Sequence, residues 1–112
     1  MKDVLKKYID LIVEWGIAQD EANSRKSNKI YDKKRKFYHE IRENINLYIN
    51  DLIYFLNDEN DYVKSGIAFL LLPYKTEEAK KALEEVSTKR GTVAFTAKMT
   101  LKLWNEGKLK FD

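Results

Sequence analysis

Apolar residues recur at helical spacing along almost the whole chain. In the first segment they follow one another at steps of three and four residues, at Val4, Tyr8, Leu11, Trp15 and Ala18. A broad apolar stripe of this period indicates an amphipathic helix, whereas a half-buried strand alternates with a period of two. No segment shows that alternation. We therefore predict an all-α protein of five or six helices packed as antiparallel hairpins.

The middle of the chain contains two further helical patterns that are separated by asparagines. The second helix has its apolar side at Ile30, Phe37 and Ile41. Asparagine side chains compete for helical hydrogen bonds, so the asparagines of residues 44–46 predict a break. The third helix has its apolar side at Leu52, Phe55 and Leu56. Either Leu47 or Tyr48 extends that side toward the break.

The segment from Tyr62 to Leu72 is apolar on nearly every side. A helix with so little polar surface belongs at the centre of a fold. We expect Asp61 to be its N-cap, because short polar side chains accept hydrogen bonds from the first free backbone N–H groups. Pro73 is expected to end it.

Two more helical patterns complete the chain. Thr76 is expected to cap a fifth helix, with Glu77 and Glu78 in the first turn, where the helix dipole favours negative charge. The last helix is predicted from Thr92 to Asn105. Gly107 fits its C-terminal stop, because glycine readily adopts the left-handed conformation found there.

A weak internal repeat relates the second half of the chain to itself. A shift of 31 residues places Leu52 on Leu83 and Val63 on Ala94, although Ile53 falls on Glu84. Chance matching and a true repeat both stay open. A true repeat of this length is somewhat shorter than the ~40-residue helical hairpins of HEAT proteins.

A likeness to a known family is carried by four segments, residues 28–32, 61–64, 82–86 and 94–101, together with Trp104. In these segments the chain resembles a bacterial domain-of-unknown-function family of small all-helical HEAT-like proteins. The resemblance spans nearly the whole chain and implies a HEAT-like short α-solenoid or bundle with no known enzymatic activity. Some similar proteins look like immunity partners of secreted toxins. The chain has lysine at position 64, where HEAT-like helices often carry arginine.

Length and composition fit one domain over residues 1–112. A chain of this size can bury one core without disulfides, and the hydrophobic share of 44% is that of a globular protein. There is no cysteine, which excludes disulfides and thiolate metal ligands. No apolar run approaches the ~20 residues that span a bilayer, and Asp10 and Glu14 interrupt the first apolar segment. We expect a cytoplasmic protein with no membrane partner.

No pattern of reactive side chains points to catalysis. His39 is the only histidine, and no glycine-rich phosphate loop or nucleophile elbow is present in the sequence. We therefore predict a protein that is not an enzyme and has no cofactor and no metal. The acidic residues Asp58, Glu59 and Asp61 lack the glycine and the final glutamate of a calcium-binding EF-hand loop. A turn followed by a helix cap is the favoured interpretation of this segment.

The net charge of +3 is unevenly distributed, because residues 1–50 carry 11 basic and 8 acidic side chains. The basic residues 33–36 stand out, flanked by Lys29, Arg42, Tyr31 and Tyr38. Four consecutive residues cover a full helical turn, so they cannot share one face. A solvated charged surface, a protein-binding surface and a nucleic-acid surface all stay open.

These observations favour a non-enzymatic protein-binding module. Through the resemblance they point to a bacterial immunity protein that neutralises a toxin domain. The alternative is a nucleic-acid-binding helical protein that uses the basic segment from Lys29 to Arg42, and self-association stays open as well. The candidate partner-binding residues are Tyr31, Arg35, Tyr38, Arg42, Asp58, Glu59, Asp61, Glu84 and Glu85.

Overall fold

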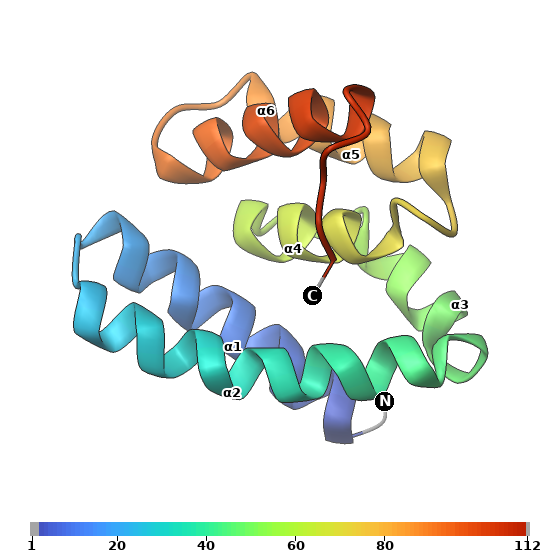
Figure 1. Ribbon diagram of the computed structural model, residues 1–112, viewed down its shortest axis with the longest axis horizontal. Coiled ribbons are helices and arrows are strands. Elements are labelled where there is room, and N and C mark those ends of the chain that lie inside the picture. Colours follow the sequence, from blue (N-terminus) through green and yellow to red (C-terminus); the bar gives the residue numbers. More distant parts are fainter. Residues whose placement is uncertain (1–2, 112) are drawn as a thin grey trace. The chain divides into compact units, whose positions relative to one another are not determined.

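The computed structural model describes residues 3–111, and every regular element in that part of the chain is an α-helix (Figure 1). The helices are α1 (Asp3–Asp20), α2 (Ser24–Glu43), α3 (Ile45–Phe55), α4 (Asp61–Leu71), α5 (Thr76–Ser87) and α6 (Thr92–Asn105). This confirms the predicted all-α class. None of the described helices combines the length and the apolarity needed to cross a bilayer. The chain divides into two compact units, residues 1–51 and 52–112, which we call the N-terminal unit and the C-terminal unit.

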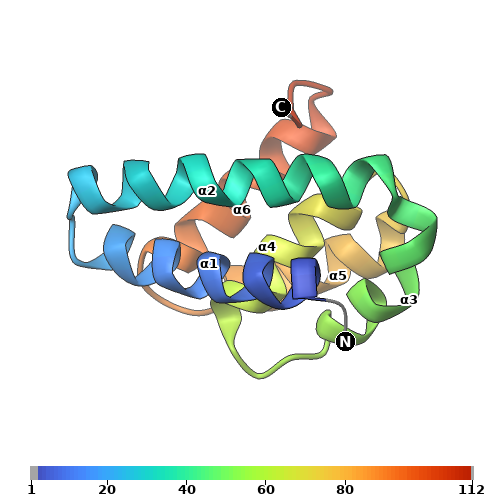
Figure 2. The ribbon, with the colours of Figure 1, turned by 90° about the horizontal axis from the view of Figure 1, so that it is seen from below.

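The N-terminal unit is built on an antiparallel hairpin of α1 and α2, which lie side by side in Figures 1 and 2. The buried side chains of these two helices are Leu5, Tyr8, Ile12, Ala18, Ser27, Ile30, Tyr38 and Ile41. Of the apolar stripe predicted for α1, Tyr8 and Ala18 are buried, whereas Val4, Leu11 and Trp15 are half-buried. In α2, Ile30 and Ile41 are buried and Phe37 is half-buried. The apolar period therefore indicates the inward side of each helix, but not its most buried residues.

The turn between α1 and α2 contains a residue with an unusual backbone conformation. Ala22 has a φ of +55°, in the left-handed region that favours glycine. Its N–H donates to the Gln19 carbonyl and the N–H of Asn23 donates to the Ala18 carbonyl, both at 3.0 Å. This pair of bonds is the Schellman arrangement that closes a helix. Asn23 then caps α2, because its Oδ1 accepts a hydrogen bond from the N–H of Lys26 at 3.1 Å.

The predicted break at residues 44–46 is confirmed at Asn44, the C-cap of α2. Its side-chain amide donates to the Glu40 carbonyl at 2.9 Å, which satisfies one of the last carbonyls of the helix. In α3, which follows, Tyr48 is 7% exposed and Leu47 is 62% exposed. Tyr48 is therefore the residue that extends the buried side of α3.

The C-terminal unit contains α4, α5 and α6, and α5 packs against both of the others. The second half of α4 is its most deeply buried part, where Ile67, Ala68, Leu70, Leu71 and the C-cap Leu72 are fully buried. The predicted stop is confirmed, because α4 ends at Leu71 and Pro73 follows the cap.

The prediction that Asp61 caps α4 was wrong by one residue. Asn60 is the N-cap, and its Oδ1 accepts hydrogen bonds from the N–H groups of Tyr62 and Val63 at 2.9 and 3.2 Å. Asn60 is itself oriented by Asp58, whose Oδ1 accepts from the Asn60 N–H at 2.8 Å. Asp61 instead occupies the first turn, where its charge still favours the helix dipole.

The prediction that Thr76 caps α5 was also wrong, because Thr76 is the first helical residue and Lys75 holds the N-cap position. The Thr76 hydroxyl donates backward to the Leu72 carbonyl at 2.7 Å. This bond ties the start of α5 to the end of α4. Glu77 and Glu78 lie in the first turn of α5, as predicted.

The last helix has the predicted bounds and a second Schellman ending. Gly107 has a φ of +71°, its N–H donates to the Trp104 carbonyl, and the N–H of Lys108 donates to the Leu103 carbonyl at 2.8 Å. The chain then returns from α6 toward α4 (Figure 1). There the ring of Phe111 lies 5.1 Å from the ring of Phe69 and 6.0 Å from that of Trp104, measured between centroids.

Candidate functional site

A groove in the C-terminal unit is the candidate site. It has an empty volume of about 520 Å³ including its open mouth. It is lined by Ile53, Leu56, Asn57, Glu78, Lys81, Ala82 and Glu85. Its lining therefore combines apolar side chains with a border of charged and amide groups.

The end of α3 and one face of α5 build this groove. Ile53 lies in the last turn of α3, and Leu56 and Asn57 follow Phe55, where the helix ends. The α5 residues of the lining stand at positions 78, 81, 82 and 85, a spacing that places them on one face of a helix. Of these, Ala82 is buried, whereas Glu78, Lys81 and Glu85 are exposed. The apolar residues thus form the floor and the charged residues form the rim.

The rim is held in place by an ion pair between two helices. The Nζ of Lys64 on α4 donates to Oε2 of Glu85 on α5 at 2.8 Å. The hydrogen bond and the positive charge of Lys64 lower the pKa of the Glu85 carboxyl below its ordinary value. The Lys64 side chain is only 16% exposed, whereas that of Glu85 is 50% exposed. Glu85 can therefore contact a partner while Lys64 orients it.

The predicted acidic residues lie on this part of the molecule but in different surroundings. Glu59 and Glu84 are exposed, and Asp58 and Asp61 are half-buried. Asp58 uses one carboxylate oxygen to bind the backbone of Asn60. Within residues 3–111, no group of three or more acidic, histidine or cysteine side chains is arranged to hold a metal ion. Of the predicted acidic residues, Glu85 lines the groove, and Asp58 directly follows the groove residue Asn57.

Of the seven residues that line the groove, sequence reasoning selected Glu85 and missed the other six, and it also missed the exposed Tyr54 next to Ile53. Tyr54 is 75% exposed, the largest exposure among the large apolar side chains found on the surface. Its ring contacts Phe55 edge-on, with centroids 5.5 Å apart. The sequence feature that could have indicated these residues is the composition of α3, which has apolar residues on more sides than a single buried face requires.

The basic and aromatic candidates on α2 are not one surface. Arg35 is exposed and Tyr31 is 42% exposed, but Tyr38 is 5% exposed and packs at 6.4 Å from the ring of Tyr8. Arg42 lies over the ring of Tyr38, and its Nη1 donates to the Tyr38 hydroxyl at 3.2 Å. Tyr38 is therefore a core residue that orients Arg42, and a partner does not reach its ring. Burial also raises the pKa of the Tyr8 hydroxyl above its ordinary value.

Among the basic residues 33–36, Lys34 differs most in its surroundings from the exposed cation that a basic cluster predicts. Its Nζ lies 4.9 Å from the centroid of the Trp15 ring on α1 and 5.6 Å from that of Tyr31. The side chain is half-buried, and burial lowers its pKa from 10.5 to about 8. The Lys34 ammonium is thus part of the packing between α1 and α2 and not of the outer charged surface.

Comparison with known proteins supports the fold of this chain and gives no information about its function. No protein-family profile matches the chain, and no curated protein matches it. The crystal structure of the protein RPA1889 from Rhodopseudomonas palustris CGA009 is similar, with a TM-score of 0.83. The match covers 96% of this chain and 90% of that one at 21% sequence identity. At that identity the similarity shows a shared fold alone.

Proposed function

We propose that this protein is a non-catalytic protein-binding module and that the groove between the end of α3 and α5 is its contact surface. The observation that carries the proposal is the combination of an apolar floor at Ile53, Leu56 and Ala82 with a charged rim. Protein interfaces share this organisation, with a buried apolar centre surrounded by polar groups.

The exposure of Tyr54 beside the groove residue Ile53 supports the same proposal. Tyrosine is enriched among the residues that dominate binding energy, because it offers a large rigid surface and one polar group. Here the Tyr54 ring is supported by Phe55 and is otherwise largely open to solvent.

The rim indicates the chemistry of the partner. Glu85 is paired with Lys64, whereas Glu78 at the rim and Glu84 on the same helix are exposed and form no ion pair among the described residues. We therefore expect a partner surface with a large apolar side chain and basic neighbours, because complementary charge favours association and excludes partners of like charge. The toxin-immunity interpretation is a finer form of this proposal. It rests on the family resemblance, and a nuclease toxin would offer such a basic surface.

The test is capture of partners by the tagged protein from the cells that encode it, with two matched variants. Ile53→Asn places an amide in the floor of the groove, and Phe95→Asn makes the same change at a 64% exposed position on α6. We expect a stoichiometric partner with the wild type and with Phe95→Asn, and its loss with Ile53→Asn. Thermal unfolding of each variant checks that the fold is intact. Equal recovery by all three proteins would reject the groove as the contact surface.

The immunity form of the proposal has its own test. The product of the neighbouring gene is produced in a sensitive host with and without this protein, and growth is measured. Rescue by the wild type that Ile53→Asn abolishes is the expected result. Failure of both rescue and direct binding would remove the toxin interpretation and leave the general protein-binding proposal to the capture experiment.

A further inference from the structure

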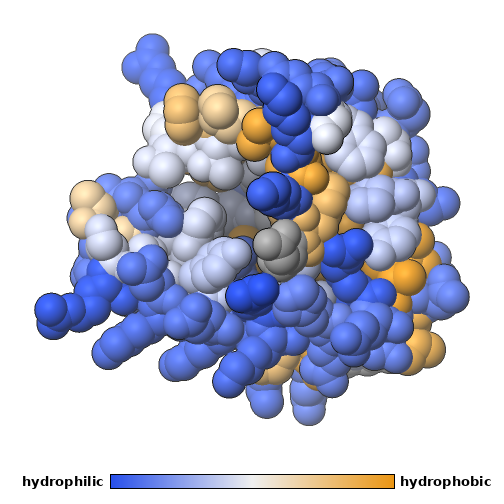
Figure 3. Space-filling view, in the orientation of Figure 1, coloured by the Kyte–Doolittle hydropathy of each residue, from blue (hydrophilic) through white to orange (hydrophobic). Residues whose placement is uncertain are grey.

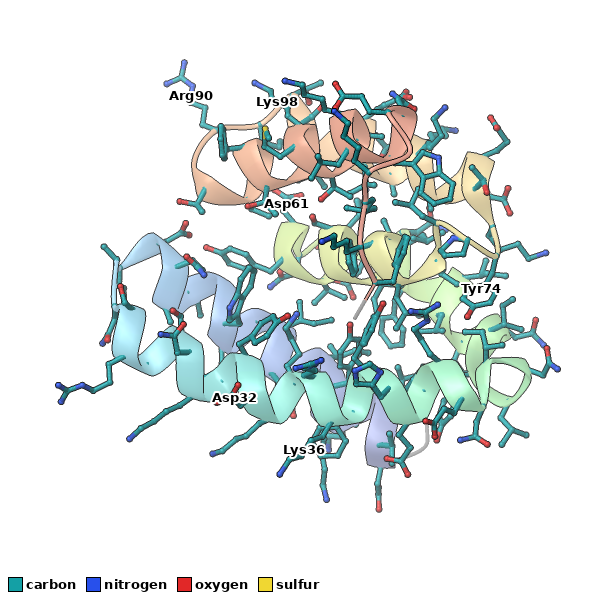
Figure 4. All side chains as sticks on the ribbon, in the orientation of Figure 1. Asp32, Lys36, Asp61, Tyr74, Arg90 and Lys98 are labelled. Carbon is teal, nitrogen blue, oxygen red and sulfur yellow. The ribbon has the colours of Figure 1, made fainter. Side chains whose placement is uncertain are left out.

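A row of four exposed cations runs along one face of α2 in the N-terminal unit. The row consists of Arg25, Lys29, Lys33 and Lys36, which follow one another at steps of four, four and three residues. Residues at these spacings are neighbours on a helix surface, and eleven residues of helix extend about 16 Å. The surface over α2 in Figure 3 is accordingly hydrophilic, and Lys36 projects outward from the helix in Figure 4.

The row is not neutralised by the chain itself. Within the described residues, no carboxylate lies within 4 Å of any of these four cationic groups. Asp32 stands four residues before Lys36 on the same side of α2, yet the two side chains do not form an ion pair (Figure 4). Glu40 stands four residues after Lys36 and does not pair with it either. The four cationic groups therefore remain available to an external anion.

The row also lacks the apolar centre that a protein interface uses. The apolar and aromatic side chains of α2 lie on other sides of the helix, with Ile30, Tyr38 and Ile41 buried. Arg35 is exposed but stands on a different side from the row, because it is one residue before Lys36 and two after Lys33. A narrow line of cations without apolar neighbours matches a partner that is recognised by charge alone.

We propose that Arg25, Lys29, Lys33 and Lys36 bind the phosphate backbone of a nucleic acid without regard to base sequence. Neutralising phosphates with lysine and arginine releases condensed counterions, which supplies the affinity of such contacts. This activity is separate from the proposed protein-binding function, because the row lies in the N-terminal unit and the groove in the C-terminal unit. Either proposal can fail while the other stands.

The test is a salt titration of binding to a fluorescently labelled 20-nucleotide single strand and to a 20-base-pair duplex, followed by anisotropy. Four phosphate contacts give slopes of log affinity against log salt of about −2.8 for the single strand and about −3.6 for the duplex. Between 50 and 200 mM salt, the affinity is then expected to fall about 50-fold and about 150-fold, respectively. Binding that persists unchanged at 200 mM salt would contradict a phosphate-based contact.

Matched variants of α2 locate the contact. The double variant Lys29→Gln/Lys33→Gln removes the two central charges and is expected to halve the salt slope. Arg35→Gln removes the same type of charge from another side of the helix and is expected to leave the slope unchanged. Asp32→Asn removes a carboxylate from the same side of α2 and is expected to tighten binding. All of these positions are exposed, so circular dichroism should show unchanged helicity.

Three further results would overturn the proposal. One is the absence of binding to either nucleic acid at 50 mM salt. Another is an equal effect of Arg35→Gln and of the double variant on the slope, which would show that net charge and not the row determines binding. The third is tighter binding to poly-glutamate than to the nucleic acids, which would assign the row to an acidic protein.

Discussion

Replacing Lys34 with methionine is expected to stabilise the protein at neutral pH. Methionine keeps the length and the apolar stem of the side chain and removes the charge. The Lys34 ammonium is half-buried between α1 and α2 with its Nζ 4.9 Å from the Trp15 ring centroid. The methionine sulfur can keep a favourable contact with that ring.

The magnitude follows from two opposing effects. Burial lowers the pKa of Lys34 from 10.5 to about 8, and at about 1.4 kcal/mol per pKa unit the buried charge costs about 3 kcal/mol. The rings of Trp15 and Tyr31 favour the ammonium by roughly 0.5–1 kcal/mol each, and the variant loses that contribution. The expected net gain in the free energy of unfolding is therefore about 1–2 kcal/mol at pH 7.

The sign of the pH dependence distinguishes this explanation from a packing effect. Because the pKa of Lys34 is lower in the folded protein, the unfolded chain binds the proton more tightly between pH 8 and pH 10.5. The cost of the charge is therefore full below pH 8 and disappears above pH 10.5. The stability of the wild type relative to Lys34→Met should rise through this window, so that the advantage of the variant is smaller at pH 9.5 than at pH 7.

The assay is urea unfolding of the wild type, Lys34→Met and Lys36→Met at pH 7 and at pH 9.5. Lys36 is exposed on the same helix, and its replacement is expected to change the free energy of unfolding by less than about 0.5 kcal/mol at either pH. A loss of stability in Lys34→Met that is equal at both pH values would refute the reasoning. It would mean that burial does not oppose the Lys34 charge and that the side chain stabilises the protein through its packing and its contacts with the rings.

Three further predictions concern the local structure. Ala22→Gly should raise the free energy of unfolding by about 1 kcal/mol, because Ala22 holds the left-handed position that closes α1, and thermal unfolding measures the gain. Tyr48→Ala should lower the free energy of unfolding by about 3 kcal/mol and Leu47→Ala by less than about 0.5 kcal/mol, since only the former is buried. Glu85→Gln should remove the small stabilisation of the fold that the ion pair with Lys64 provides. In the wild type, 1 M salt should remove the same stabilisation. Since the pKa of Glu85 is lowered, that stabilisation should be present at neutral pH and lost as the pH falls through that pKa, as acid titration of both proteins would show.

The helices of this protein were predictable from the sequence because their apolar period is regular. The period identifies the buried side of a helix but not its first residue, because neighbouring residues can both serve as caps. Asn60 and Asp61 have similar side chains, and only the extended backbone of Asn60 decides that it caps α4. The choice between Leu47 and Tyr48 was open for a similar reason, since both fit a helical side that is wide and apolar.

The surfaces were less predictable because they depend on contacts between distant residues. Lys34 has the sequence surroundings of an exposed cation, but its environment is set by Trp15 on another helix. Tyr38 has the spacing of a secondary aromatic line and is nonetheless buried against Tyr8. The groove exists only because the end of α3 lies near α5. No sequence motif in either segment predicts that the two segments lie close together.

Calorimetric titration with the purified protein partner tests the groove most directly. For the wild type we expect one partner per chain and a negative heat-capacity change, which is the signature of apolar surface removed from water. Ile53→Asn, with its fold intact, is expected to weaken the affinity at least tenfold. Undiminished affinity in that variant, or a heat-capacity change near zero for the wild type, would contradict the assignment of the groove as the place where this protein binds.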